Sequence, residues 1–357
     1  MPAIVRLTRE MMPLPPRKVV VAGLFFVCLI VAIPAWLVLN NRGEANHQVV
    51  PDTFNGARSY GYLKQICALG RRPSGSPGMA KQRELLIAHF ARSGGKVLEQ
   101  KFTARHPETG AEVPLSNLVV HWHPQRRDRI LLCAHYDTRP FPDEDRRNRK
   151  GVFIGANDGA SGVALLAELA HLMPGLKSHY GVDFVLFDAE EFIFDAQRDR
   201  DLYFLGSTYF AKWYREEPPE KYRYCFAVLL DMVADKELKI FQEKNSLRYA
   251  APVVKSIWRT ARKLKMREFV HRSRHEISDD HLPLNKIARI PTCDIIDFDY
   301  PRIGSRRNSF WHTTKDRPEA CSGESLAKVG TVVYQWLKTA DQDVRLTKLR
   351  DRKRARR

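Results

Sequence analysis

The sequence predicts an α/β domain with a mostly parallel, mixed central sheet flanked by helices, preceded by an N-terminal transmembrane helix. Apolar runs that read as strands alternate with amphipathic segments that read as helices, which is typical of a sheet with helices on both faces. Motifs rich in Asp, Glu and His directly follow several of these strands. Because ligands of such sheets bind beyond the carboxyl ends of the strands, we expect the motifs to form one site.

Residues 19–39 form an unbroken apolar run, long enough to cross a bilayer, which takes ~20 residues. Basic residues precede it, so the positive-inside rule places residues 1–18 in the cytoplasm and the rest of the chain in the periplasm or a lumen. A cleaved signal peptide is the alternative. Its apolar core would span about 7–15 residues and end at a small-residue cleavage site, which this run lacks. We therefore expect a single-pass membrane protein with an uncleaved anchor.

The rest of the chain has room for one large domain. Of the 357 residues of the whole chain, 44% are apolar and 28% are charged, which is ordinary for a globular protein. The net charge of +18 collects in loops and in the tail without a nucleic-acid-binding motif. We therefore expect solvated loops attracted to a membrane surface, and no nucleic-acid partner. We expect a linker, a folded domain and a basic tail over residues 40–55, 56–340 and 341–357.

The first part of the domain reads as two helices followed by three strands. Hydrophobic periodicity predicts the helices, and a loop rich in Pro and Gly separates them. Alternating or continuous apolar residues predict the strands. In chain order these elements span residues 52–69, 76–93, 97–103, 116–123 and 129–134.

The remainder alternates helices and strands. The run SGVALLAELAHL, with Ser161 near its cap, predicts a helix over residues 161–172. Short apolar runs predict buried strands, and an amphipathic segment predicts a closing helix. The expected strands span residues 182–187, 225–230 and 292–298, and the further helices span residues 208–215, 252–264 and 325–338.

Two possible metal ligands lie between the strand over residues 129–134 and the next helix. His135 leaves the strand end, and Asp137 is placed to orient its second ring nitrogen. Asp158 lies among small residues in the run GANDGASG, just before the helix. A structural histidine and a helix N-cap are the alternatives. The two residues together favour a metal site.

Adjacent glutamates follow the apolar strand over residues 182–187 in the run DAEE. Neighbouring carboxylates repel each other unless a cation or a proton resolves the conflict. The economical division makes one of Glu190 and Glu191 a metal ligand and the other a proton carrier. A solvated acidic turn is the alternative, and the apolar strand before the pair argues against it.

Three more motifs carry ionisable residues after strands or in loops. Asp231 directly follows a buried strand, Asp279 belongs to the run SDDHLP, and His312 follows Trp311 in the run WHT. Each motif alone is weak. Their number within one α/β domain predicts a metal-assisted hydrolase type of site.

The motifs HYD, GANDGASG, DAEE, LLD, SDDHLP and WHT, in this order, resemble those of the M28-type zinc aminopeptidases. Within that clan they resemble the animal and bacterial glutaminyl-peptide cyclotransferases. The similarity covers roughly residues 69–337. It implies a zinc aminopeptidase-like fold and peptide or protein N-termini as substrates. The motif set is specific for the clan and less decisive between its two activities.

The resemblance also implies roles for individual residues. Asp158, Glu191 and His312 match the ligands of the zinc that both activities share, and Glu190 matches the general base and acid. His135 and Asp231 match positions that hold a second zinc in the two-metal peptidases. In the cyclotransferases this second site is empty, and the position of Asp231 instead belongs to an acid network that includes Glu190 and Asp279.

SDDHLP and the Trp before the last His favour the cyclotransferase, which converts an N-terminal glutamine to pyroglutamate and releases ammonia. We therefore expect one zinc ion per chain. A two-zinc aminopeptidase is the alternative. A non-catalytic, membrane-anchored binding module is less favoured, because every expected site position is kept.

The chain departs from the animal cyclotransferases at one point. They carry a tryptophan shortly after the glutamate pair, whereas this chain has the run FIFDA there. We therefore expect the substrate to stack on Phe192, Phe194 or Trp311. We also expect the basic insert over residues 139–150 to border the mouth of the site.

Overall fold

The computed structural model describes residues 53–195, 197–199, 202–299 and 309–354. The expected anchor over residues 19–39 and most of the expected linker lie outside these residues. Among the helices of the described part, none is both long and apolar enough to cross a membrane.

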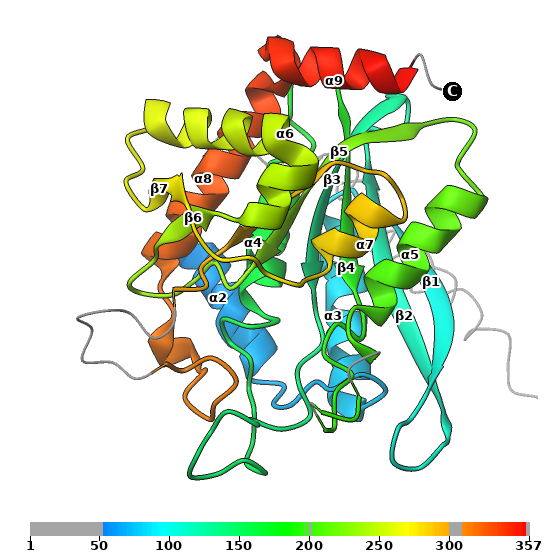
Figure 1. Ribbon diagram of the computed structural model, residues 1–357, viewed down its shortest axis with the longest axis vertical. Coiled ribbons are helices and arrows are strands. Elements are labelled where there is room, and N and C mark those ends of the chain that lie inside the picture. Colours follow the sequence, from blue (N-terminus) through cyan, green and yellow to red (C-terminus); the bar gives the residue numbers. More distant parts are fainter. Residues whose placement is uncertain (1–52, 196, 200–201, 300–308, 355–357) are drawn as a thin grey trace, which may run out of the picture. The chain divides into compact units, whose positions relative to one another are not determined.

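A six-stranded mixed sheet forms the centre of the domain (Figure 1). Its strands lie in the order β1-β2-β4-β3-β5-β8, and the pairs β1–β2 and β2–β4 are antiparallel while the other three are parallel. The mixed sheet expected from the sequence is therefore confirmed. The strands are β1 (Lys96–Arg105), β2 (Glu112–Trp122), β3 (Asp128–His135), β4 (Gly181–Phe187), β5 (Arg223–Asp231) and β8 (Thr292–Ile296).

Helices cover both faces of this sheet (Figure 1). One face packs against α2, α3, α4, α6 and α8, and the other packs against α5 and α7. Successive residues of β3 show the division, because Leu132 belongs to the first core cluster and Leu131 to the second. The helices are α2 (Gly56–Cys67), α3 (Pro77–Arg92), α4 (Ser161–Ala170), α5 (Leu205–Glu216), α6 (Lys244–Lys263), α7 (His281–Lys286), α8 (Gly323–Thr339) and α9 (Val344–Arg354).

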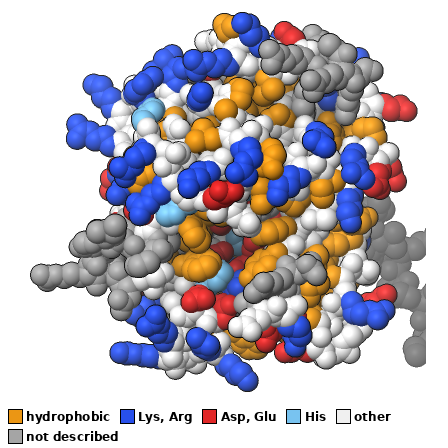
Figure 2. Space-filling model, viewed as in Figure 1, with side chains coloured by type: hydrophobic (Ala, Val, Ile, Leu, Met, Phe, Trp, Pro, Cys, Tyr) orange, Lys and Arg blue, Asp and Glu red, His pale blue; other side chains and the backbone are white. Residues whose placement is uncertain are grey.

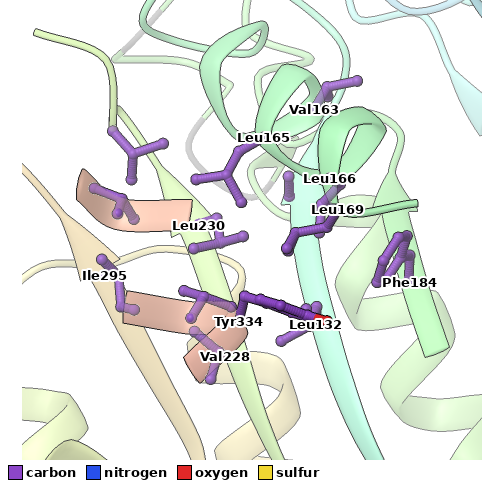
Figure 3. Packing of buried hydrophobic residues seen from close by; sticks show 14 of the residues in the cluster. Leu132, Val163, Leu165, Leu166, Leu169, Phe184, Val228, Leu230, Ile295 and Tyr334 are labelled. Carbon is purple, nitrogen blue, oxygen red and sulfur yellow. The ribbon is translucent and has the colours of Figure 1, made fainter. Parts of the chain in front are cut away.

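The helix α4 lies at the centre of the larger core. All ten of its residues are buried, which explains why apolar residues occupy most of its surface rather than one stripe. Leu165, Leu166 and Leu169 of α4 lie over Leu132 and Leu230 of the sheet (Figure 3). Burial of each such leucine contributes about 1.5–3 kcal/mol relative to exposure. This packing fixes the segment before α4, which carries Asp158.

The helix α6 begins at Lys244, earlier than the expected helix over residues 252–264. Pro252 lies inside it, and Ala250 has a non-helical φ of −136° where the helix kinks. A proline ring clashes with the carbonyl one turn earlier, so it breaks the regular helix there. The sequence pattern from Pro252 onward therefore indicated a helix start. The structure shows that the first two turns precede it.

A second, two-stranded parallel sheet lies beside α6. It pairs β6 (Ile240–Gln242) with β7 (Phe269–Ser273). The chain continues from β7 into the segment over residues 275–279, which borders the candidate site. In the tail, α9 packs the fully buried Leu346 against the larger core, so part of the expected basic tail is folded.

Candidate active site

A cleft of about 720 Å³ opens beyond the carboxyl ends of the parallel strands. Figure 2 shows this hollow near the centre of the visible face, with acidic and histidine side chains inside it. The structure brings together here seven residues that the sequence singled out: Asp158, Glu190, Glu191, Asp231, Asp279, Trp311 and His312. His135, at the end of β3, is buried directly beside Asp158 and Asp231.

Unusual backbone geometry marks three of the site segments. Ala189, Met232 and His312 have φ values of 57°, 50° and 52°, in the left-handed region that residues other than glycine seldom adopt. Such conformations cost of order 1–3 kcal/mol each and persist only where the surroundings hold them. At Ala189 two hydrogen bonds stabilise this conformation, because the next two N–H groups, of Glu190 and Glu191, donate to the carboxylate of Asp137.

The first possible metal group consists of Asp158, Glu191 and His312. His312 Nε2 lies 2.9 Å from Glu191 Oε1 and 3.3 Å from Asp158 Oδ2. Ligands about 2.0–2.2 Å from a tetrahedral zinc ion lie roughly 3.3 Å from one another. The spacing and the donor set of one imidazole and two carboxylates therefore fit zinc.

The charges of this group support a bound cation. Burial and Arg139 oppose protonation of His312, but Glu191 and Asp158 raise its pKa to about 9. Burial alone would raise the pKa of Asp158, but hydrogen bonds to His135 and His312 hold it below its usual value. A proton on each histidine thus partly occupies the place that a metal ion would take between these carboxylates.

A second group shares Asp158 with the first. His135 Nε2 lies 3.2 Å from Asp158 Oδ1 and 3.2 Å from Asp231 Oδ1. These spacings also fit ligands of one ion. The expected support of His135 by Asp137 is only a long contact of 3.5 Å between Nδ1 and Oδ1. Asp137 instead accepts the backbone N–H groups of the glutamate pair, which orders the strand end after β4.

Glu190 reaches the cleft beside these two groups. Its side chain is 12% exposed, and its Oε2 lies 3.9 Å from His135 Nδ1. Burial raises the pKa of Glu190 well above its usual value, and the charges of Glu191 and Asp279 raise it further. Burial also raises the pKa values of Asp279 and Asp231, and the charge of Asp231 adds to the shift at Asp279. The cleft therefore holds carboxyl groups that retain a proton more readily than free ones.

Of the three aromatic residues expected at the substrate, Trp311 lines the cleft and the two phenylalanines do not. Trp311 borders the cleft, and its ring stacks on that of His312 with 3.8 Å between centroids. Phe192 is only 1% exposed and packs with Leu115, and Phe194 lies against His106. Neither phenylalanine is among the residues that line the cleft. The arrangement does not favour stacking of a substrate on them, and the other cleft aromatics are Tyr203, Phe204 and Phe298.

Comparison with known proteins agrees with this geometry. The model of peptidase family M28 matches residues 117–337. The chain belongs to peptidase family M28. A glutaminyl-peptide cyclotransferase from Bothrops jararaca is 25% identical over 283 residues, which is 70% of this chain and 72% of that protein. The predicted resemblance to the M28 clan and its cyclotransferases is thereby confirmed.

Solved structures of both activities resemble this M28 member. The glutaminyl cyclase of Fimbriiglobus ruber is 39% identical with a TM-score of 0.74, and the match covers 81% of this chain and 97% of that one. A leucine aminopeptidase precursor from Bacteroides thetaiotaomicron is 30% identical with a TM-score of 0.73, covering 81% and 98%. The fold is thus common to both, and the higher identity lies with the cyclase.

Two residues to which the sequence assigned no role at the site, Arg139 and Asp316, support the possible metal ligands. Arg139 donates from its backbone N–H and from Nη1 to the two oxygens of Glu191, at 3.0 and 2.8 Å. Asp316 accepts the N–H groups of Asn157 and Asp158. Burial, together with the charge of Asp158, raises the pKa of Asp316 to about 8. Their closeness in sequence to the HYD and WHT motifs was the signal available.

Proposed function

We propose that this chain is a zinc-dependent glutaminyl-peptide cyclotransferase. It converts the N-terminal glutamine of peptides or proteins to pyroglutamate and releases ammonia. The observation that carries the proposal is a proton-holding carboxyl cluster directly beside a zinc-compatible ligand group. Glu190, Asp279 and Asp231 form the cluster, all lining one cleft. The 39% identity to a glutaminyl cyclase supports the same conclusion.

Asp158, Glu191 and His312 would hold one zinc ion. When bound there, zinc supplies a Lewis acid for the side-chain carbonyl oxygen of the substrate glutamine. The side-chain amide carbon of that glutamine then becomes more electrophilic, and the neutral α-amine of the same residue can attack it. The reaction forms a carbon–nitrogen bond within the substrate, breaks the amide bond to the leaving nitrogen, and consumes no water.

Glu190 would move the one proton that this exchange requires. It accepts a proton from the attacking amine and gives it to the nitrogen that leaves as ammonia. A carboxyl group with a raised pKa suits this double role, because it must accept and release a proton near neutral pH. Asp279 and Asp231 would share the proton with Glu190, and Trp311 would form one wall of the pocket.

Replacement of Glu190 tests the proposal. Glu190→Gln keeps the size of the side chain but cannot accept the proton, so we expect cyclisation of a glutamine peptide to slow about 10²–10⁴-fold. Zinc content should stay that of the unaltered chain, since Glu190 is outside the ligand group. Unchanged turnover in the variant would contradict the assignment of Glu190.

A two-zinc aminopeptidase is the second candidate, and one observation favours it. The spacing of His135, Asp158 and Asp231 fits an ion as well as that of the first group does. Glu190 would then activate a water molecule rather than an amine. Metal analysis of the purified protein separates the candidates, because we expect one zinc ion per chain for the cyclotransferase and two for the aminopeptidase.

We also propose that residues 19–39 anchor the protein in a membrane as an uncleaved single span. Residues 1–18 would lie in the cytoplasm, and the catalytic domain over residues 56–340 would lie on the other side, in a periplasm or lumen. The support is the apolar length and the basic residues before it. Such a placement would give the enzyme exported peptides and protein N-termini as substrates.

A further inference from the structure

A cluster of basic side chains lies beside the cleft and has no part in the chemistry described above. Lys239, Arg272 and Arg274 all stand over the ring of Phe241, with their charged groups 5.4, 5.6 and 5.2 Å from its centroid. Phe241 is 3% exposed and belongs to β6, while Arg272 belongs to β7. We call these three cations the basic ridge.

The basic ridge keeps a net positive charge. Asp299 lies 2.8 Å from Arg274 and 3.6 Å from Lys239, and Asp297 accepts the backbone N–H of Lys239, so three cations face two carboxylates. Arg272 is exposed, and no carboxylate among the residues that the structure describes forms an ion pair with it. The aromatic contact holds the guanidinium in place without neutralising it. Arg272 is therefore positioned to bind an anion that arrives from solution.

A line of rings connects the basic ridge with the substrate pocket. The ring of Phe241 lies 6.2 Å from that of His275, which lies 5.9 Å from that of Phe298, and Phe298 contacts Trp311 at 5.2 Å. His275, Phe298 and Trp311 line the cleft. The guanidinium of Arg272 is thus within about 12 Å of His275, a span that about three or four extended residues cover.

The basic insert over residues 139–150 fits this role less well. Arg146, Arg147, Arg149 and Lys150 are exposed there. The acidic Asp145 lies among them and bonds Thr314, and Glu144 borders the cleft itself. No aromatic contact among the described residues holds these four cations in place. Within the part of the chain that the structure describes, the basic ridge therefore fits the role better than the insert does.

We propose that the basic ridge selects peptides with acidic residues a few positions after the N-terminal glutamine. This inference rests on the proposed function, because the glutamine must occupy the cleft for the following residues to reach Arg272. By these spacings an extended substrate passes His275 at about its third or fourth residue, and the carboxylates of the residues that follow lie beside the ridge. Peptides with basic residues at those positions are disfavoured by the same charge.

Peptide kinetics test the proposal on the full chain loaded with zinc. The substrates are three amidated peptides that begin Gln-Gly-Gly and continue with three glutamates, three glutamines or three lysines, and the quantity measured is kcat/KM for cyclisation. At low salt we expect the acidic peptide to exceed the neutral one about two- to fivefold, as for an exposed ion pair, with the lysine peptide below both. In about 1 M NaCl the three values should converge, because salt screens exposed charges.

Two charge-reversal variants locate the effect. Arg272→Glu should abolish or reverse the preference while leaving kcat/KM for the neutral peptide unchanged, which also shows that the variant folds. Lys255→Glu is the control. It makes the same charge change at an exposed position of α6 that belongs neither to the basic ridge nor to the residues that line the cleft, so it should keep the preference.

Equal rates for the three peptides in the unaltered chain would overturn the inference while leaving the proposed function intact. Loss of the preference in Lys255→Glu to the same degree as in Arg272→Glu would also overturn it, because the cause would then be overall charge. Absence of cyclisation with every peptide would overturn the proposed function, and this inference with it.

Discussion

At the residue scale, the proposed zinc ligands Glu191 and His312 have supporting neighbours outside the sequence motifs. Arg139 holds both oxygens of Glu191, and its Nε and Nη2 bond the carboxylate of Asp143. Asp143 in turn lies 3.5 Å from His312 Nδ1. The pair therefore links two ligands that come from separate segments of the chain. Contacts of this kind orient metal ligands.

Removal of the arginine should weaken metal binding. We expect Arg139→Ala to lower zinc affinity about 10–100-fold, because Glu191 loses the partner of one oxygen and Asp143 its counter-charge. Competition with a chromogenic chelator measures the affinity. Arg215→Ala is a matched control, since it removes an exposed pair with Glu216, neither of which lines the cleft, and it should not change zinc affinity. Equal affinities in both variants would rule out the supporting role.

Zinc affinity should also depend on pH with a defined sign. Without metal, Glu191 and Asp158 raise the pKa of His312 to about 9, so the imidazole carries a proton at neutral pH. Zinc requires the neutral imidazole, and binding must release that proton. We therefore expect the apparent affinity to fall at least about tenfold for each pH unit below 9. A pH-independent affinity between pH 6 and 9, measured by the same competition, would contradict this.

At the same scale, residues next to strand and helix ends could be predicted from the sequence, whereas the direction of the chain after the glutamate pair could not. Asp158, Glu190 and Glu191 were predictable because each directly follows a strand or precedes a helix. Phe192, Phe194 or Trp311 was expected to stack on the substrate; Trp311 lines the cleft, whereas the chain turns at Ala189 and directs the two phenylalanines against the β1–β2 hairpin. A left-handed alanine has no sequence signature, so the turn could not be foreseen.

At the element scale, Glu243 joins α6 to the segment that carries Asp279. Its carboxylate caps α6 by accepting the N–H groups of Asn245 and Ser246, and it also accepts the N–H of Ile277. Burial alone would raise the pKa of Glu243, but His281 and these N–H groups hold it at about 2. A depressed pKa means that the stabilisation is present above about pH 4.5 and is lost as the pH falls toward 2.

Loss of this cap should affect both stability and turnover. We expect Glu243→Ala to destabilise the domain by more than the ~1 kcal/mol of an ordinary cap and to lower kcat, because Ile277 and Asp279 line the cleft. Ser322→Ala removes the cap of α8 and should cost about 1 kcal/mol without changing kcat. Thermal unfolding and peptide cyclisation measure the two effects. A kcat that falls equally in both variants would argue against the connection to Asp279.

Short elements were the hardest to predict. β6 has three residues and pairs with β7, 29 positions further along, as Ile240 with Phe269. No local pattern specifies such a pairing, since its stability comes from packing against α6 and not from its own residues. The cations of the basic ridge lie in or next to β6 and β7. Lys239 is far from Arg272 and Arg274 in the sequence, and the three come together only through this pairing, so the sequence alone did not indicate a cluster.

At the scale of the whole molecule, the topology brings distant motifs together. β3, β4 and β5 are parallel neighbours, so the residues that follow them meet at one edge of the sheet. That rule made the location of the site predictable from the order of strands and motifs. The spacing of the ligands was not predictable, because it depends on side-chain contacts such as that of Arg139 with Glu191.

The expected anchor gives a prediction at this scale. We expect the full chain to sediment with membranes and to require detergent for release. A chain that begins at residue 50, where the compact unit starts, should be released without detergent and cyclise glutamine peptides at the same rate. Fractionation by ultracentrifugation followed by the peptide assay measures both. Recovery of the full chain in the supernatant without detergent would contradict the anchor.

The most direct test of the cyclotransferase activity compares two substrates with the same protein. Purified, zinc-loaded full chain is incubated with a glutamine peptide and, separately, with a chromogenic leucine amide, and the products are followed as ammonia, pyroglutamyl peptide and leucine. A cyclotransferase should give ammonia and pyroglutamyl peptide in equal amounts and no leucine. Leucine release without pyroglutamyl peptide would contradict the proposed activity and assign this M28 member to the aminopeptidases.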